Sequence, residues 1–252
     1  MKNSFYSFLI VAAVMLGSVC AQGAEATAQA IVLAVKGPVN AVINGGNPTD
    51  IKVGDKLPQG TLISSGPGGQ ADIQVFNGAV ATIHPDTTVT LEKLAITASG
   101  GVVTKQTALL NLKVGSIASN IDPANHNIND YGIRTPKGVA AARGTSYTVN
   151  VSSTGTVQVF VTNSAVTFYN AATGQTVKVP AGSKVVVAAD GTIQPPVQMT
   201  SAELKTANAE GKPVEPGSIT TSGDTNKNDN APDQGNSSSK PAVIVLDPSP
   251  SA

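Results

Sequence analysis

Apolar and polar side chains alternate over many short segments between Gln29 and Ile193. Val, Ile and Thr dominate these segments, and Gly, Pro, Asn or Asp interrupts them about every 8–12 residues. β-Branched residues favour strands, and the interrupting residues favour turns. The pattern predicts a single all-β domain of many short strands, built as a sandwich, a barrel or a short β-solenoid.

Two segments show this alternation and the interrupting turn residues most clearly. In "ADIQVFNGAVATI" the residues Ile73 and Val75 alternate with polar neighbours, and Asn77-Gly78 suits a two-residue turn that needs positive φ at both positions. In "TSYTVNVSSTGTVQVFV" the apolar side chains of one strand resume after a turn from Ser152 to Gly155. Both segments are therefore predicted to be β-hairpins.

The composition changes after Pro195-Pro196, so we place the all-β domain at residues 22–195 and a separate tail at residues 196–252. Thr200 and Glu203 have the spacing of a capping box, which predicts a short helix near residues 201–210. The polar segment beyond it is rich in Pro, Gly, Asn and Ser, and we expect it to be disordered. An apolar run at residues 242–246 could form an edge strand of the domain, join a partner's sheet, or be a hydrophobic remnant.

The first 21 residues have the organisation of a secretory signal peptide. A short basic start precedes an apolar run of 15 residues from Phe5 to Val19, with small residues before a cleavage point after Ala21. The run is shorter than the about 20 residues that a membrane-spanning helix needs. We therefore expect an exported protein, periplasmic or extracellular, without an integral membrane segment in its mature form. Cys20 could instead accept a lipid anchor, but Gly17 and Val19 stand where that signal prefers Leu and a small residue.

The charge and the aromatic content of the chain argue against a nucleic-acid partner. Lys and Arg together number 16, as do Asp and Glu, and the chain has no Trp. Nucleic acids attract basic patches and exposed stacking rings, and the sequence indicates neither. We expect no nucleic-acid partner.

Candidate catalytic and metal-binding residues are sparse. The two histidines, His84 and His126, are far apart in the sequence, and "GDKLPQG" resembles a cupin segment without the metal-binding residues. The sequence also has no "GxSxG" motif. We therefore expect no catalytic residues, no metal and no cofactor, which leaves a cupin-like or other enzyme as the least favoured class.

The stretch "RTPKGVAAARGTSYTVNV" holds both arginines of the chain, Arg134 and Arg143. Pro136 disfavours helix at Thr135, and the small residues that follow allow the backbones of neighbouring segments to approach closely. An arginine offers five donors in a fixed geometry and can hold several backbone carbonyls at once. This predicts that Arg143 is a buried or half-buried structural clamp whose removal costs several kcal/mol.

The same stretch resembles the signature of the FecR-type domain. In that signature, Thr-Pro and an apolar position precede Arg-Gly-Thr and an aromatic residue within a strand. The matching residues are Thr135, Pro136, Val139, Arg143, Gly144, Thr145 and Tyr147. "VGDKLPQGTLISSGPGGQADIQVFNGAVATIHPDTTVTLE" and "LLNLKVGSIASNI" resemble earlier parts of the family, so the resemblance spans about residues 50–190. Arg134 has no counterpart in the pattern.

The resemblance implies an all-β extracytoplasmic module, best known as the periplasmic part of an anti-sigma regulator that senses a TonB-dependent receptor. The sequence shows neither an anti-sigma segment nor a transmembrane helix, so we expect a stand-alone exported member. We expect it to bind a protein or an envelope component without catalysis, in cell-surface signalling linked to the regulation of transport. A structural or adhesive scaffold is the alternative.

The longest polar connection between strands is the candidate for partner binding, because loops commonly carry recognition. Its candidate residues are Asp122, Asn125, His126, Asp130 and Tyr131.

Overall fold

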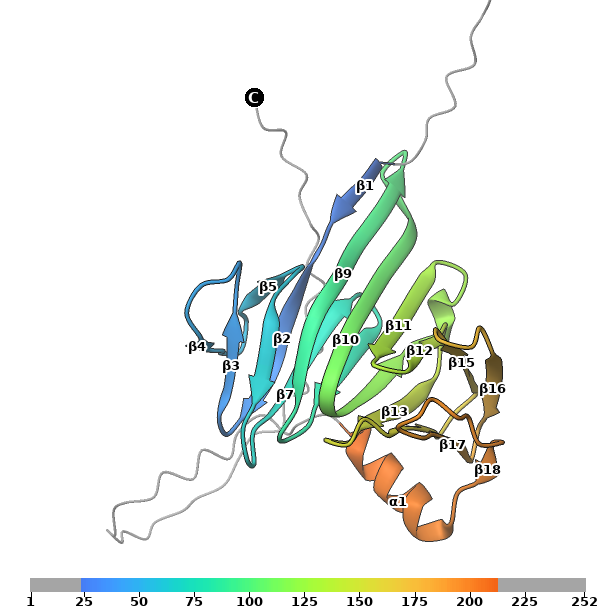
Figure 1. Ribbon diagram of the computed structural model, residues 1–252. Coiled ribbons are helices and arrows are strands. Elements are labelled where there is room, and N and C mark those ends of the chain that lie inside the picture. The colour runs from blue at the N-terminus through green and yellow to red at the C-terminus, as the bar shows by residue number, and fades with distance from the viewer. Residues whose placement is uncertain (1–23, 213–252) are drawn as a thin grey trace, which may run out of the picture. The chain divides into compact units, whose positions relative to one another are not determined.

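The computed structural model describes residues 24–212 (Figure 1). The predicted signal peptide with Cys20, and the tail from residue 213 onward with its apolar run, lie outside the described residues. Within them the all-β prediction is confirmed, because strands β1 to β18 are joined by one 3₁₀ helix, η1, and one α-helix, α1. The strand pairings connect all the strands into one closed arrangement around a common core.

The strands form two sheets, which we name sheet A and sheet B. In sheet B the order is β5-β2-β7-β8-β10-β13-β14-β17-β18. Its strands are β2 (Gln29–Lys36), β5 (Lys56–Pro58), β7 (Gln70–Phe76), β8 (Ala79–Ile83), β10 (Val102–Ile121), β13 (Ser146–Val151), β14 (Val157–Val161), β17 (Ser183–Val187) and β18 (Val197–Gln198).

Sheet A has the order β4-β3-β6-β9-β10-β11-β12-β15-β16. Strand β1 lies beside the far half of β9, on the same edge as β6. The strands are β1 (Ala24–Thr27), β3 (Val39–Val42), β4 (Thr49–Asp50), β6 (Leu62–Ser65), β9 (Thr88–Ser99), β11 (Asn129–Thr135), β12 (Gly138–Ala142), β15 (Ala165–Asn170) and β16 (Thr176–Pro180). Both predicted hairpins are present, as β7–β8 and β13–β14. In the β7–β8 turn, however, only Gly78 has the expected positive φ, and Asn77 does not.

Short corners carry the chain repeatedly from one sheet to the other, as between β2 and β3 or between β12 and β13. Strand β10 crosses without a break: its first half lies between β9 and β11 in sheet A, and its second half between β8 and β13 in sheet B. After β10 the chain turns through η1 (Pro123–Asn125) and enters sheet A again as β11. For this reason β11 runs parallel to β10, whereas the other pairs are antiparallel.

Gly115 lies where β10 passes from one sheet to the other. Its φ is +100°, and a Cβ atom there would come within 2.5 Å of Thr87 Cα. The backbone N–H of Ser116 donates to Thr87 Oγ1 at 2.9 Å. Only glycine combines this backbone conformation with so close an approach of a second strand.

The core is made by the inward-facing side chains of both sheets, as the alternation of apolar residues predicts. Ile73, Leu110 and Val159 are fully buried. Two tyrosines lie among these aliphatic groups, Tyr131 and Tyr147, with ring centroids 6.3 Å apart in an edge-to-face arrangement.

Helix α1 (Ser201–Glu210) packs against the outer face of sheet B, close to β13, β17 and β18 in Figure 1. The predicted capping box is present: Thr200 Oγ1 accepts from the Glu203 N–H, and Glu203 accepts from the Thr200 N–H. Glu203 also pairs with Lys184 on β17, and Asn120 on β10 donates to the carbonyl of Gly211. Strand β18 pairs with β17, so the compact unit continues past residue 195 and includes α1.

Candidate interaction surface

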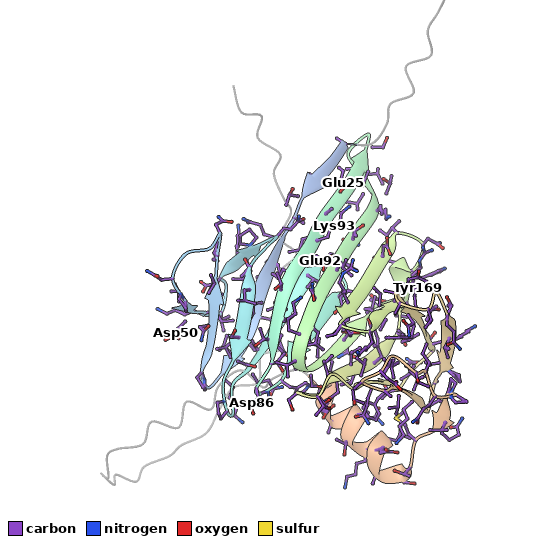
Figure 2. All side chains as sticks on the ribbon, viewed as in Figure 1. Glu25, Asp50, Asp86, Glu92, Lys93 and Tyr169 are labelled. Carbon is purple, nitrogen blue, oxygen red and sulfur yellow. The ribbon has the colours of Figure 1, made fainter. Side chains whose placement is uncertain are left out.

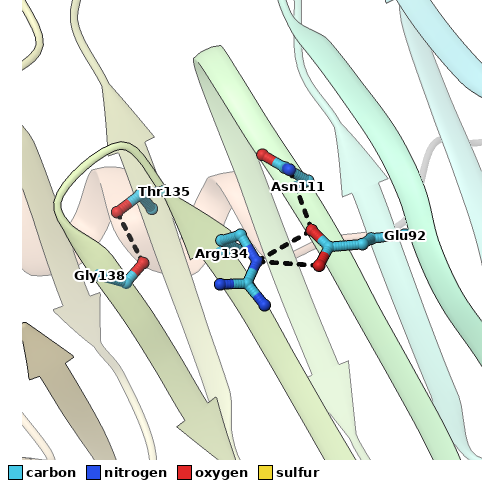
Figure 3. A network of polar contacts seen from close by, with 5 residues as sticks. All are labelled: Glu92, Asn111, Arg134, Thr135 and Gly138. Atoms are coloured by element: carbon cyan, nitrogen blue, oxygen red, sulfur yellow. Dashed lines mark hydrogen bonds and ion pairs between the residues drawn. The ribbon is translucent and has the colours of Figure 1, made fainter. Parts of the chain in front are cut away.

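The signature residues lie at the connection between the two sheets, and most of them make structural contacts. Thr135 Oγ1 donates to the Gly138 carbonyl at 3.0 Å and closes the turn that contains Pro136 (Figure 3). Tyr147 is 2% exposed and lies in the core. Thr145 is 3% exposed, and its hydroxyl donates to the Asn163 carbonyl.

Gly144 allows two segments to approach closely. Its φ is +131°, and a Cβ atom there would lie 2.7 Å from Pro123 Cα. Pro123 begins η1, so the signature and the loop that follows β10 are packed directly against each other. A side chain at position 144 would separate them.

The prediction that Arg143 is a buried clamp is wrong. Arg143 is exposed, and no hydrogen bond or ion pair of its side chain occurs in the described part of the chain. The physical reason is its place after β12, where Ala142 points into the core and Arg143 points outward by strand alternation. The contacts expected of Arg143 are made by Thr135, Thr145 and Tyr147.

Arg134, which the family pattern does not cover, is the arginine with a defined partner. Its Nε lies 3.0 Å from Glu92 Oε1 and 2.9 Å from Glu92 Oε2, and Asn111 Nδ2 donates to the same carboxylate at 2.9 Å (Figure 3). Glu92 stands at a register shift between β9 and β10, and this bulge directs both Glu92 and Lys93 away from the core. The three side chains form a polar row across β9, β10 and β11.

Arg134, Glu92 and Asn111 belong to the outer face of sheet A, which we name the open face. Among residues 24–212 no element covers it, whereas α1 packs on the outer face of sheet B. Figure 2 shows Glu25, Lys93 and Glu92 following β1 and β9 on one side of this face, and Tyr169 on the side of β15.

The centre of the open face is apolar. Gly132 on β11 is opposite Leu109 on β10 and Ala141 on β12, and a Cβ atom on Gly132 would lie 3.3 Å from both Leu109 and Val139. The neighbouring strand β15 contributes Tyr169, which is 47% exposed. Tyrosine and arginine are among the residues that most often dominate binding energy at protein interfaces.

The predicted partner-binding loop is only partly accessible. Tyr131 is 1% exposed, and its hydroxyl lies 2.8 Å from Ser119 Oγ in the core, where burial raises the pKa of the phenol. Tyr131 therefore does not line a surface. Asp122 is exposed and caps η1 by accepting from the Ala124 N–H, and His126 is exposed.

The other two loop residues differ in position. Asn125 is half-buried within η1. Asp130 lies on the open face, paired with Lys105 at 3.0 Å. The loop therefore borders the open face through Asp130, and its role in binding remains a prediction.

No three His, Cys, Asp or Glu side chains of residues 24–212 come together as a potential metal site. His84 lies near the end of α1, where burial lowers the pKa of its imidazole against the opposing effects of the Glu210 carbonyl and Asp72. Within the same residues no helix has the length and apolar character needed to cross a membrane.

Sequence reasoning missed the apolar centre of the open face and the row beside it. Strand alternation marks Leu109, Asn111 and Ala141 as outward residues, but it does not show which face of a sheet stays uncovered. That information depends on the position of α1, which the sequence alone does not give.

The fold and its open face define an all-β domain with one covered sheet and one accessible sheet. Residues 61–167 match the family model described as FecR protein, which confirms the resemblance over this part of the chain. The match includes all seven signature residues. A search of curated proteins found no match.

Two solved structures are similar to the chain, and both are described as a "putative anti-sigma factor" from Parabacteroides distasonis. Each is 14% identical and covers 57% of this chain, with TM-scores of 0.46 and 0.45. The aligned part spans 62% of the length of those chains.

Proposed function

We propose that this protein is an exported, non-catalytic FecR-domain protein that binds a protein or an envelope component through the open face, in a signalling role. The observation that carries the proposal is the contrast between the two sheets. Helix α1 packs on the outer face of sheet B, whereas Tyr169, Ala141 and Lys178 are exposed on the outer face of sheet A.

The composition of the open face supports binding to another protein. Tyr169 offers an aromatic ring, Leu109 and Val139 are half-buried around Gly132, and the Arg134–Glu92 pair lies beside them. Interfaces of this kind combine an apolar centre with a polar rim. These side chains come from several adjacent strands of an open sheet, and such an arrangement suits a folded partner better than a small molecule, which normally occupies a concave pocket.

The match to the FecR family model supports a role in signalling. Members of this family are best known for relaying the state of an outer-membrane receptor, and the match covers the strands β10, β11 and β12 that form the centre of the open face. Export is supported by the sequence of residues 1–21.

Affinity capture from envelope extract of the native host tests the proposal. Ala141→Gln adds a large neutral group at the centre of the open face, and Tyr169→Ser removes its aromatic ring. The parent chain should capture a stoichiometric partner. We expect each variant to capture at least tenfold less of it. Val53→Ser is the matched control, since Val53 is 65% exposed in a loop outside this face.

Unchanged capture by both open-face variants would refute the proposal. Sedimentation of the purified parent chain separates this role from a scaffold role. Concentration-dependent assembly that Ala141→Gln abolishes would favour the scaffold.

A further inference from the structure

The open face carries the net positive charge of the described chain. Strand register places more cations than anions on it. The cations are Lys93, Lys105, Lys113, Arg134, Arg143 and Lys178, and the anions are Glu25, Asp50, Glu92 and Asp130. In the rest of residues 24–212, Lys and Arg together equal Asp and Glu in number.

Three of the four anions of the open face already have a cationic partner, and the fourth, Asp50, lies at the edge of the sheet on β4. Glu25 pairs with Lys93 at 2.9 Å, Asp130 with Lys105 at 3.0 Å, and Glu92 with Arg134 at 2.9 Å. Two of these pairs join neighbouring strands, the Arg134–Glu92 pair reaches across β10, and the charges within each pair neutralise one another.

The remaining cations are Lys113, Arg143 and Lys178, all exposed and without an ion pair within the described residues. Arg143 directly follows β12, and Lys178 lies two strands away on β16, so both stand near the apolar centre. Lys113 stands on β10, two residues beyond Asn111.

We infer that the open face recognises a protein surface whose Asp and Glu side chains are placed to meet Lys113, Arg143 and Lys178. The inference rests on the proposed binding role of this face. A surplus of cations repels a second copy of the same face and attracts an acidic partner, which raises the association rate as well as the affinity. The apolar centre then supplies the contact area between the charges.

A protein fits this arrangement better than a nucleic acid. A phosphate backbone presents closely spaced charges, and the carboxylates of Glu25, Glu92 and Asp130 are distributed among the cations of the face. Tyr169 is its one strongly exposed ring, whereas single-stranded nucleic acid binds to several stacked rings. Separate carboxylates can instead meet separate cations.

The test uses the full chain and two sets of substitutions with equal net charge. The first set is Lys113→Gln, Arg143→Gln and Lys178→Gln, and the control set is Lys36→Gln, Lys52→Gln and Lys56→Gln, which are exposed residues outside the open face. The probes are a Glu-rich dodecapeptide and a single-stranded dodecanucleotide. Binding is followed by the backbone amide spectrum of the labelled chain.

We expect the peptide to shift amides of β10, β12 and β16. The first set should weaken peptide binding at least fivefold, the control set less than twofold, and added salt should weaken it further because exposed charges are screened. Equal losses in both sets, peptide shifts mapped elsewhere, or tighter binding of the dodecanucleotide would overturn the inference.

Affinity capture with the two sets of substitutions, compared with Ala141→Gln, distinguishes a failure of this inference from a failure of the proposed function. If Ala141→Gln loses the host partner while the triple Gln variant keeps it, the open face binds a partner that is not acidic. If neither variant loses it, the proposed function itself fails.

Discussion

Arg134 on β11 meets Glu92 on β9 across the intervening strand β10, with its Nε at 3.0 and 2.9 Å from the two carboxylate oxygens. The side chain of Asn111 on β10 joins the same carboxylate. The contact therefore connects three adjacent strands of the open face, and both charged side chains are still accessible to water.

This accessibility limits what the pair adds to stability. The side chains of Arg134 and Glu92 are 43% and 33% exposed. A double-mutant cycle with Arg134→Gln and Glu92→Gln should give a coupling free energy of at most about 1 kcal/mol, reduced by added salt. Denaturant unfolding at low and high salt measures it, and a salt-independent coupling of several kcal/mol would contradict this assignment.

Arg143→Ala should leave the free energy of unfolding within about 0.5 kcal/mol of the parent, because the arginine is exposed and without a hydrogen bond among residues 24–212. Tyr147→Ala, four residues further, is the contrasting variant, since removing a fully buried aromatic side chain costs about 3–5 kcal/mol. Thermal and urea unfolding of both variants measure these changes in the free energy of unfolding. A large loss in Arg143→Ala would restore a structural role for this residue.

Gly115→Ala should destabilise the protein by more than about 2 kcal/mol, because the new methyl group meets the Thr87 backbone while φ stays positive. Gly100→Ala is the control: its φ is +59°, and no atom lies within 4 Å of the added carbon. That variant should lose only about 1 kcal/mol. Equal losses in the two variants would show that the crowding at Thr87 is unimportant.

The stability of the protein should fall as the pH decreases below 6.5, in part because of His84. Burial lowers the pKa of His84 in the folded protein below its ordinary value of 6.5. The unfolded chain therefore binds the proton more readily, so this contribution is complete above pH 6.5 and is lost as the pH falls toward the folded pKa. Burial raises the pKa of Glu210, which acts in the opposite direction at lower pH.

Variants distinguish the effects of His84 and Glu210 on the pH dependence of stability. In a Glu210→Gln background, the loss of stability between pH 7.5 and pH 5.5 should be larger with His84 than with His84→Gln. Urea unfolding at each pH measures the difference. Identical pH profiles would show that His84 is as accessible to protons in the folded state as in the unfolded state.

Much of the fold follows from the sequence, because alternation and turn residues act locally. Asn77-Gly78 forms the turn of the β7–β8 hairpin, and Thr200 and Glu203 form the predicted capping box. These features depend on a few neighbouring residues, so their physical causes are visible in one short segment.

The site was less predictable because it depends on relations between distant segments. The bulge at Glu92 brings its carboxylate to Arg134, 42 residues later, and no local pattern gives that register. Tyr131 resembles a loop residue in sequence, yet it is the third residue of β11 and points inward to Ser119. Strand alternation also places Arg143: because Ala142 points inward, the next residue, Arg143, points outward.

The parallel pairing of β10 and β11 also constrains the order in which the domain can fold. Strand β11 can add to sheet A only after the second half of β10 and η1 have been placed, because the chain reaches β11 through them. The antiparallel strands from β2 to β10 have no such requirement. The segment before Ile121 can therefore form a folding nucleus, and the signature stretch, which completes the centre of the open face, is added late. A chain interrupted before β12 would present sheet A without the apolar centre of the open face.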